Sequence, residues 1–273
     1  MPTGTPRVAV TRTTANRKDY AAIAAAKITQ PSKVPTRLPT ILVYSRNKKG
    51  KTRFCMSPGQ GNVLIIDPER GTDEYITRDP HVWHLTSWEE LDDIYKYLRH
   101  TKHTYSWVAL DGLTRMSNMS LRYVMAQAEE HDLNRRPGMV QQRDYGKAGE
   151  LMKGMLYNFR NLEMGVIYTA HERQIDGSEF SEDDDVEDTT VQYVADLPKG
   201  VRAAVNGIVD VIGRLYVVKV DKDDKQVPQR RLWLEPSAIY DTGCRSDYTL
   251  PQYLTNPTAT KLAKLMKEGP ANG

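Results

Sequence analysis

The sequence contains few of the residues that cross-link a protein or anchor it in a membrane. Cysteine occurs only twice in 273 residues, at Cys55 and Cys244, which is too few for a disulfide framework or a cysteine metal cluster. No apolar run approaches the length of a membrane span, and the first residues lack the apolar core of a signal peptide. We therefore expect a soluble protein without a membrane partner, located in a reducing compartment, the cytoplasm.

Charge is distributed unevenly along the chain, although the net formal charge is only +3. Residues 1–53 contain twelve Lys and Arg but a single acid, Asp19, whereas residues 176–188 contain eight Asp and Glu and no basic residue. Such blocks are usually solvated loops or tails, and a basic block can also bind a polyanion. Composition alone leaves both interpretations open.

Strand-like and helix-like segments alternate through the middle of the chain. Apolar runs of strand length occupy residues 41–44, 62–67, 105–111 and 164–170. Between them, helical patterns occupy residues 87–99, where Ser87 and Glu90 form a potential capping box, and residues 117–130 and 146–162. This alternation predicts an α/β fold with a mostly parallel sheet flanked by helices.

The two ends of the chain have a different character. Residues 1–37 are basic and punctuated by proline, with a short helix expected near residues 20–28, so they are interpreted as an arm or linker. Residues 38–273 are interpreted as one α/β domain. Its last part has a helix near 198–206, β-rich runs at 209–220 and 230–235, and a helix at 258–267, which predicts an antiparallel β extension.

The most informative segment follows the first predicted strand. It ends in Gly50-Lys51-Thr52, the end of a P-loop, in which backbone N–H groups and the lysine bind phosphates and the hydroxyl binds magnesium. Ser45 stands where the motif has glycine, and a side chain can resist the tight turn expected there. The alternative is a basic surface loop that contains Gly-Lys-Thr by chance. In a P-loop, the nucleotide-binding residues would be Ser45, Arg46, Asn47, Lys48, Lys49, Gly50, Lys51, Thr52 and Arg53.

Polar side chains follow three of the predicted strands. Asp67-Pro68-Glu69 ends the second strand, Asp111 ends the third and His171 follows the fourth. Ligands of open α/β sheets bind at these carboxyl ends. We expect Asp111 to hold magnesium together with Thr52, Glu69 to activate water, and His171 to sense the terminal phosphate. The plainer alternatives are a turn-forming aspartate, a surface glutamate and a histidine that caps a strand.

In their order along the chain, these segments resemble a phage RecA-like P-loop ATP-binding protein, of the class that includes minimal recombinases and ATP-assisted single-strand annealing proteins. The likeness rests on residues 45–52, 66–69, 108–111 and 167–172, and on the tail residues 240–245, 250–251 and 256–257; it covers roughly residues 38–268. In RecA-like cores the water-activating glutamate stands where this chain has Glu69, in the pattern Asp67-x-Glu69. In AAA+ proteins it stands beside the magnesium aspartate, and this chain has Gly112 at that position.

The resemblance implies a RecA-like P-loop core that uses ATP and Mg²⁺. By that likeness, Lys51, Glu69 and His171 are catalytic, Thr52 and Asp111 bind the metal, and Arg245 is the cation that completes the site of a neighbouring subunit. It also implies a homo-oligomer, as a ring or filament, that acts on single-stranded DNA in phage recombination or replication.

One departure affects the expected DNA contacts. The loop after His171 contacts DNA in RecA-like proteins, but the acidic residues 176–188 would repel a phosphate backbone. On charge grounds the basic arm, Lys147, Lys153, Lys199 and Arg202 are better contacts. Two other functions stay open: a helicase or translocase with the same site, and a non-hydrolysing annealing or loading module in which Ser45 weakens nucleotide binding.

Overall fold

The computed structural model describes residues 19–30, 37–132, 134–176 and 191–270. Most of the basic arm and, from residue 177 onward, the acidic segment lie outside these residues. The chain divides into two units, Met1–Thr36 and Arg37–Gly273. In the first unit, α1 (Tyr20–Lys27) is capped by Asp19, whose carboxylate accepts the N–H groups of Ala21 and Ala22.

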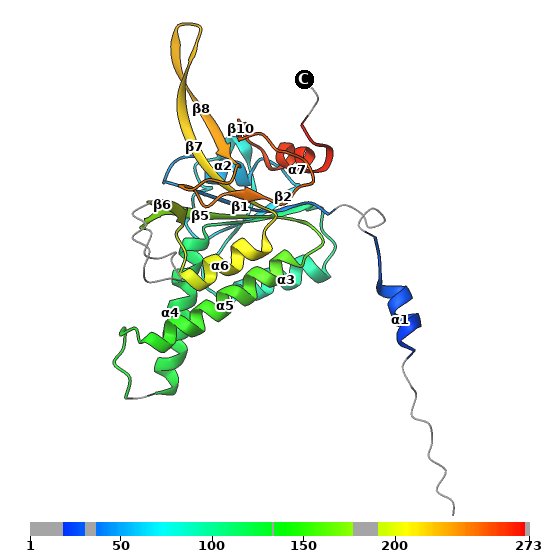
Figure 1. Ribbon diagram of the computed structural model, residues 1–273. Helices are drawn as coiled ribbons and strands as arrows, with labels where there is room; N and C mark the ends of the chain where they lie inside the picture. Colours follow the sequence, from blue (N-terminus) through cyan, green and yellow to red (C-terminus); the bar gives the residue numbers. More distant parts are fainter. Residues whose placement is uncertain (1–18, 31–36, 133, 177–190, 271–273) are drawn as a thin grey trace, which may run out of the picture. The chain divides into compact units, whose positions relative to one another are not determined.

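The second unit is built on a mixed β-sheet (Figure 1). Its strands follow the order β10-β8-β7-β1-β5-β4-β2-β3, with β6 beside β5 and β9 beside β7. Neighbours from β7 to β3 in this order are parallel, whereas β6, β8, β9 and β10 pair antiparallel. The predicted α/β fold, a mostly parallel sheet with an antiparallel extension, is therefore confirmed. The strands are β1 (Thr40–Ser45), β2 (Val63–Asp67), β3 (His81–His84), β4 (Trp107–Asp111), β5 (Gly165–Ile175), β6 (Gln192–Ala195), β7 (Val211–Lys222), β8 (Lys225–Trp233), β9 (Gly243–Cys244) and β10 (Tyr253–Thr255).

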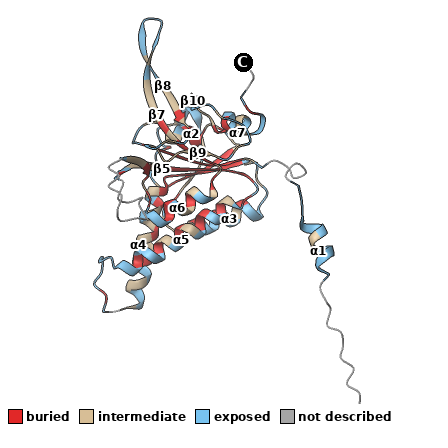
Figure 2. Ribbon diagram, in the orientation of Figure 1, coloured by how far each residue is buried: buried red, intermediate tan, exposed pale blue. Residues whose placement is uncertain are grey.

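Helices cover both faces of the sheet, so its central strands are buried on both sides (Figure 2). Every residue of β1 and β4 is buried, as the nearly continuous apolar runs of a parallel sheet require. In β1, Leu42 and Tyr44 pack toward the layer of α3, α4, α5 and α6, while Ile41 and Val43 pack toward α2 and α7. The helices are α2 (Lys51–Cys55), α3 (Glu90–His100), α4 (Leu113–His131), α5 (Gln142–Arg160), α6 (Lys199–Ile208) and α7 (Ala259–Glu268), with a 3₁₀ turn at Ile76–Arg78.

Several element boundaries differ from the sequence prediction. β5 does not end before His171 but continues to Ile175, because its last four residues pair with β6. The strands β3 and β6 were not predicted, since neither contains a long apolar run. α3 begins at Glu90, and only half of the expected capping box forms: the Glu90 carboxylate accepts the N–H of Ser87.

Two further observations concern cross-links and membranes. Cys55 and Cys244 are both free cysteines. Across the described part of the chain, no helix combines the length and the apolar character needed to cross a bilayer.

Candidate active site

The polar residues expected from the sequence meet at the carboxyl edge of the parallel strands. β5 lies between the strand that leads into the P-loop and the strand that ends in Asp111, so Ser45 pairs with His171 and Asp111 pairs with Thr169. A cavity of about 590 Å³ opens at this edge. Its walls include Lys51, Thr52, Glu69, Asp111 and His171.

The loop between β1 and α2 makes its turn later than the sequence suggested. Lys48 and Gly50 adopt left-handed backbone conformations, with φ of 60° and 107°. Ser45 is instead the last residue of the extended strand β1 and is completely buried. Its hydroxyl donates to the Arg46 carbonyl at 2.9 Å. The serine side chain therefore does not obstruct the turn, and the left-handed conformation falls at Gly50, where it costs least.

The ammonium group of Lys51 lies against the loop that precedes it. Nζ is 3.2 Å from the Ser45 carbonyl oxygen, 3.4 Å from Ser45 Oγ and 3.3 Å from Nδ1 of His171. Burial lowers the pKa of Lys51, and the nearby carboxylates of Asp111 and Glu69 oppose this effect. Its oxygen partners, from Ser45 and Arg46, are all neutral. Phosphate oxygens entering the cavity would give the lysine charged acceptors, which form stronger hydrogen bonds.

Asp111 is buried and is hydrogen-bonded by two threonine hydroxyls. Thr169 Oγ1 donates to its Oδ1 at 2.7 Å, and Thr52 also hydrogen-bonds this carboxylate. Burial raises the pKa of Asp111, and the two hydrogen bonds partly counteract that shift.

The pair formed by Thr52 and Asp111 fits a magnesium ion. A hydroxyl and a carboxylate supply the hard oxygen ligands that Mg²⁺ prefers. Among the described residues, no group of three or more His, Cys, Asp or Glu could hold a metal ion. An ion bound here would therefore take most of its ligands from phosphate and water, as Mg²⁺ usually does in nucleotide sites.

Asp67 shapes the turn that carries Glu69. Its buried carboxylate accepts the N–H groups of Glu69 and Thr72, both at 2.9 Å, and the Thr72 hydroxyl at 2.6 Å. The Glu69 carboxylate takes no part in this turn; its Oε1 lies 3.5 Å from Nε2 of His171. The hydrogen bond from His171 lowers the pKa of Glu69, against an opposing effect of burial. Glu69 is thus an ionised carboxylate with free lone pairs, as a general base must be.

His171 connects Glu69 to Lys51. An ammonium can only donate, so a hydrogen bond from Lys51 to Nδ1 of His171 corresponds to the tautomer with its proton on Nε2. That nitrogen faces Glu69. A change in the position of Lys51 would therefore move the imidazole ring of His171, which in turn contacts Glu69.

Other residues predicted for the site lie outside this cavity. Arg46 forms an ion pair with Glu172 at 3.2 Å, and the exposed Arg53 lines a neighbouring cavity. Arg245 donates to the Gly207 carbonyl near the start of β1, at the opposite edge of the sheet from the P-loop. Its role in a neighbouring subunit stays a prediction. Within the P-loop itself, Asn47, Lys48, Gly50, Lys51 and Thr52 line the cavity.

The cavity residues that the sequence prediction missed include Thr169 and Arg230. Thr169 is the one Ser or Thr within the largely apolar run 166–170, and this position could have identified it. Arg230 comes 181 residues after Lys49, whose carbonyl oxygen is 3.3 Å from its Nε. It belongs to the polar run Gln229-Arg230-Arg231, in which no pattern distinguishes it.

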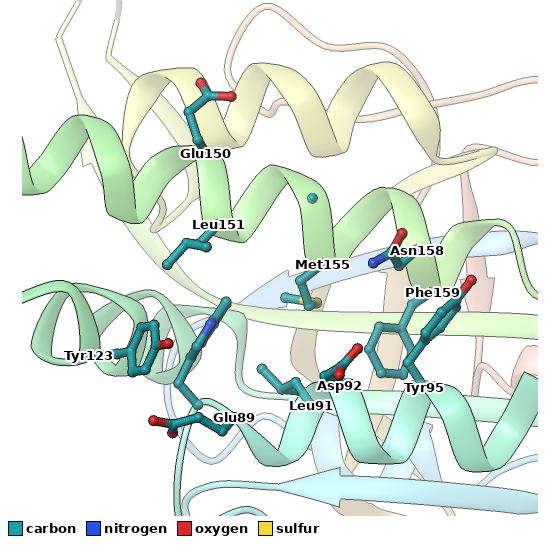
Figure 3. A pocket seen from close by; sticks show the side chains of 12 residues that line it. Glu89, Leu91, Asp92, Tyr95, Tyr123, Glu150, Leu151, Met155, Asn158 and Phe159 are labelled. Carbon is teal, nitrogen blue, oxygen red and sulfur yellow. The ribbon is translucent and has the colours of Figure 1, made fainter. Parts of the chain in front are cut away.

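A second cavity, of about 440 Å³, lies among α3, α4 and α5 (Figure 3). Aromatic and apolar side chains such as Tyr95, Met155 and Phe159 form much of its wall, and Glu89 and Glu150 add negative charge. Its lining contains no lysine, arginine or histidine. This cavity therefore offers nothing that would bind a polyphosphate, unlike the cavity at the P-loop.

Comparison with known proteins agrees with the geometry of the P-loop cavity. Residues 37–246 match a family model described as an AAA domain, which covers more than half of the chain. No curated protein matches the sequence. The matched segment contains the P-loop and also Glu69, Asp111 and His171, which lie just after β2, at the end of β4 and within β5. The chain therefore belongs to the AAA domain family of nucleotide-binding P-loop ATPases.

Proposed function

We propose that this protein hydrolyses ATP with the help of magnesium and uses the reaction to act on single-stranded DNA in phage recombination or replication, by annealing or strand exchange. The observation that carries the proposal is the single cavity in which Lys51, Thr52, Glu69, Asp111 and His171 meet. Family membership supports the ATPase activity. The DNA substrate and the phage context rest on the sequence resemblance.

The side chains divide the chemistry among them. Lys51 binds phosphate oxygens, and Thr52 and Asp111 are the residues that would hold Mg²⁺, whose charge offsets that of the phosphates. Glu69 orients a water molecule toward the terminal phosphate and accepts its proton. His171, between Lys51 and Glu69, senses whether the terminal phosphate is present.

The position of Gly112 supports a RecA-like arrangement within the AAA domain family. Gly112 directly follows Asp111, with φ of 134°, and a Cβ placed on it would lie 3.5 Å from Oε1 of Glu69. The glutamate therefore reaches the space beside the magnesium aspartate from the neighbouring strand β2. A Cβ at position 112 would already be in van der Waals contact with this carboxylate.

The proposed DNA contacts differ in how accessible they are. Lys147 on α5 and Lys199 on α6 are exposed, while Lys153 pairs with Glu150 at 2.7 Å. Arg202 is only 5% exposed, so its prediction as a surface contact is wrong. The ring or filament is proposed on the resemblance, with the exposed Arg245 as the cation supplied to a neighbouring subunit.

The test is an ATPase assay with and without single-stranded DNA, with Lys51→Ala beside the parent. We expect Lys51→Ala to lose binding or turnover by on the order of 100-fold, because a charged phosphate contact is removed. Lys49→Ala is the matched control, since that side chain does not line the cavity. Equal turnover by Lys51→Ala and the parent would refute the proposal.

The same assay separates the two alternative functions. DNA-stimulated turnover with processive strand displacement would identify a helicase or translocase. Annealing that persists in Lys51→Ala, with no ATP turnover in the parent, would identify a non-hydrolysing annealing module.

A further inference from the structure

Arg230 stands at the wall between two cavities beside the P-loop. The phosphate cavity and a neighbouring cavity of about 430 Å³ are both lined by Gly50 and Arg230. The neighbouring cavity also contacts Arg53 and Asn256. A ligand that extends from the phosphate cavity into the neighbouring one would therefore pass the Arg230 side chain.

The hairpin of β7 and β8 holds Arg230 against the P-loop. Arg230 pairs with Val217 across the hairpin, and the nearby Leu215 and Leu232 pack in the same core as Phe54 of α2. The approach is close, because a Cβ placed on Gly50 would lie only 2.6 Å from Nε of Arg230. Gly50 thus serves the loop both through its positive φ and by leaving room for this arginine.

Only part of the Arg230 guanidinium is used within the protein. Its Nε donates to the Lys49 carbonyl at 3.3 Å. Within the described residues, neither of its terminal amino groups has a hydrogen-bond or ion-pair partner. Arg230 lines the phosphate cavity, and a guanidinium anchored through Nε keeps two amino groups available to bind phosphate oxygens.

We propose that Arg230 binds the phosphate chain of the nucleotide on the side nearer the sugar. This inference rests on the proposed nucleotide binding and extends it. Lys51, Thr52 and Asp111 mark the end of the cavity where the terminal phosphates bind. Arg230 lies at the boundary with the second cavity, so it contacts the phosphates between that end and the sugar. The ligands it selects are nucleoside 5′-di- and triphosphates.

The experiment compares Arg230→Gln with Arg231→Gln in the full chain, using titrations with ATP, ADP and adenosine. Arg231 is the matched control because it points to the other face of β8, where it stacks on Tyr253 at 4.4 Å. We expect Arg230→Gln to weaken ATP and ADP binding by roughly 10- to 100-fold, the range for a charge-assisted hydrogen bond. Adenosine binding should not change, Arg231→Gln should match the parent, and Arg230→Lys should recover part of the loss.

Two results would overturn the inference. Parental affinity of Arg230→Gln for ADP would remove Arg230 from the site. An equal loss for ADP and adenosine, together with a lower melting temperature of the ligand-free protein, would show that Arg230 only supports the loop. If the proposed nucleotide binding is itself wrong, the parent would bind ATP no better than Lys51→Ala does. The inference about Arg230 would then be wrong as well.

Discussion

Replacing Glu69 with glutamine tests the assignment of the general base. The substitution keeps the size of the side chain and leaves the turn intact, because Asp67 holds that turn through backbone N–H groups and Thr72. The glutamine carbonyl can still accept the hydrogen bond from His171. What disappears is the negative charge that accepts a proton from water.

The substitution of Glu69 should slow the chemical step and leave nucleotide binding almost unchanged. General base catalysis contributes roughly 10²- to 10⁴-fold, which corresponds to a rise in the activation barrier of about 3–5 kcal/mol. ATP affinity should stay within about threefold of the parent or rise slightly, because a carboxylate 3.5 Å from His171 no longer repels the phosphates. A large fall in kcat with unchanged binding is thus the predicted signature.

The assay pairs steady-state ATP hydrolysis with a direct nucleotide titration of the same preparations. Glu74→Gln is the matched control, since Glu74 is an exposed carboxylate that lines the same cavity. Hydrolysis by Glu69→Gln at the parental rate would refute the assignment of the base. A comparable loss in Glu74→Gln would show that the charge of the cavity, rather than Glu69 itself, determines the rate.

Four further predictions concern the P-loop and the packing around two glycines. Ser45→Gly should leave ATP affinity within about threefold, because Ser45 is already extended within β1; a gain of tenfold or more in a nucleotide titration would show that the serine hinders the loop. ATP affinity should fall as pH rises, because only the protonated form of Lys51 attracts phosphate. Burial lowers the pKa of Lys51, so the fall should begin at a pH below the usual pKa range of lysine. A constant affinity up to that range would contradict this. Gly165→Ala should lower the free energy of unfolding by about 1–3 kcal/mol, since its Cβ would collide with the Trp107 ring. Gly154→Ala should raise the free energy of unfolding by roughly 0.5–1 kcal/mol, because an added Cβ on α5 would have nothing within 4 Å. Urea unfolding curves that shift in the same direction for both glycine variants would contradict the packing argument.

Local sequence patterns predicted the parts of the fold that depend on local physics. The apolar runs that became β1, β2 and β4 are buried on both faces, and such strands cannot contain many polar residues. Polar stretches in strands were harder to recognise. In the last part of β5, Glu172 is stabilised by Arg214, which donates from Nε at 2.6 Å, and this partner lies far away in the sequence.

In the site too, residues in local sequence patterns were predicted, whereas a residue brought in from a distant part of the chain was not. Lys51, Thr52, Glu69 and Asp111 stand at strand ends or in a recognisable loop, so their convergence follows from the parallel sheet. Arg230 comes from the antiparallel hairpin, and no local pattern shows that this hairpin folds back on the P-loop. The concern about Ser45 arose because sequence alone does not show at which residue the chain turns.

The insertion of β5 between β1 and β4 has a consequence for engineering. Adjacent strands are about 4.8 Å apart, so β1 and β4 are separated by roughly 10 Å, a spacing that backbone hydrogen bonds maintain. Side chains in the helical layers do not determine that spacing. The helices α3 and α5 contribute no residue to the P-loop cavity, so they can be redesigned for a higher melting temperature while the strands keep the strand-end groups of that cavity at their distances.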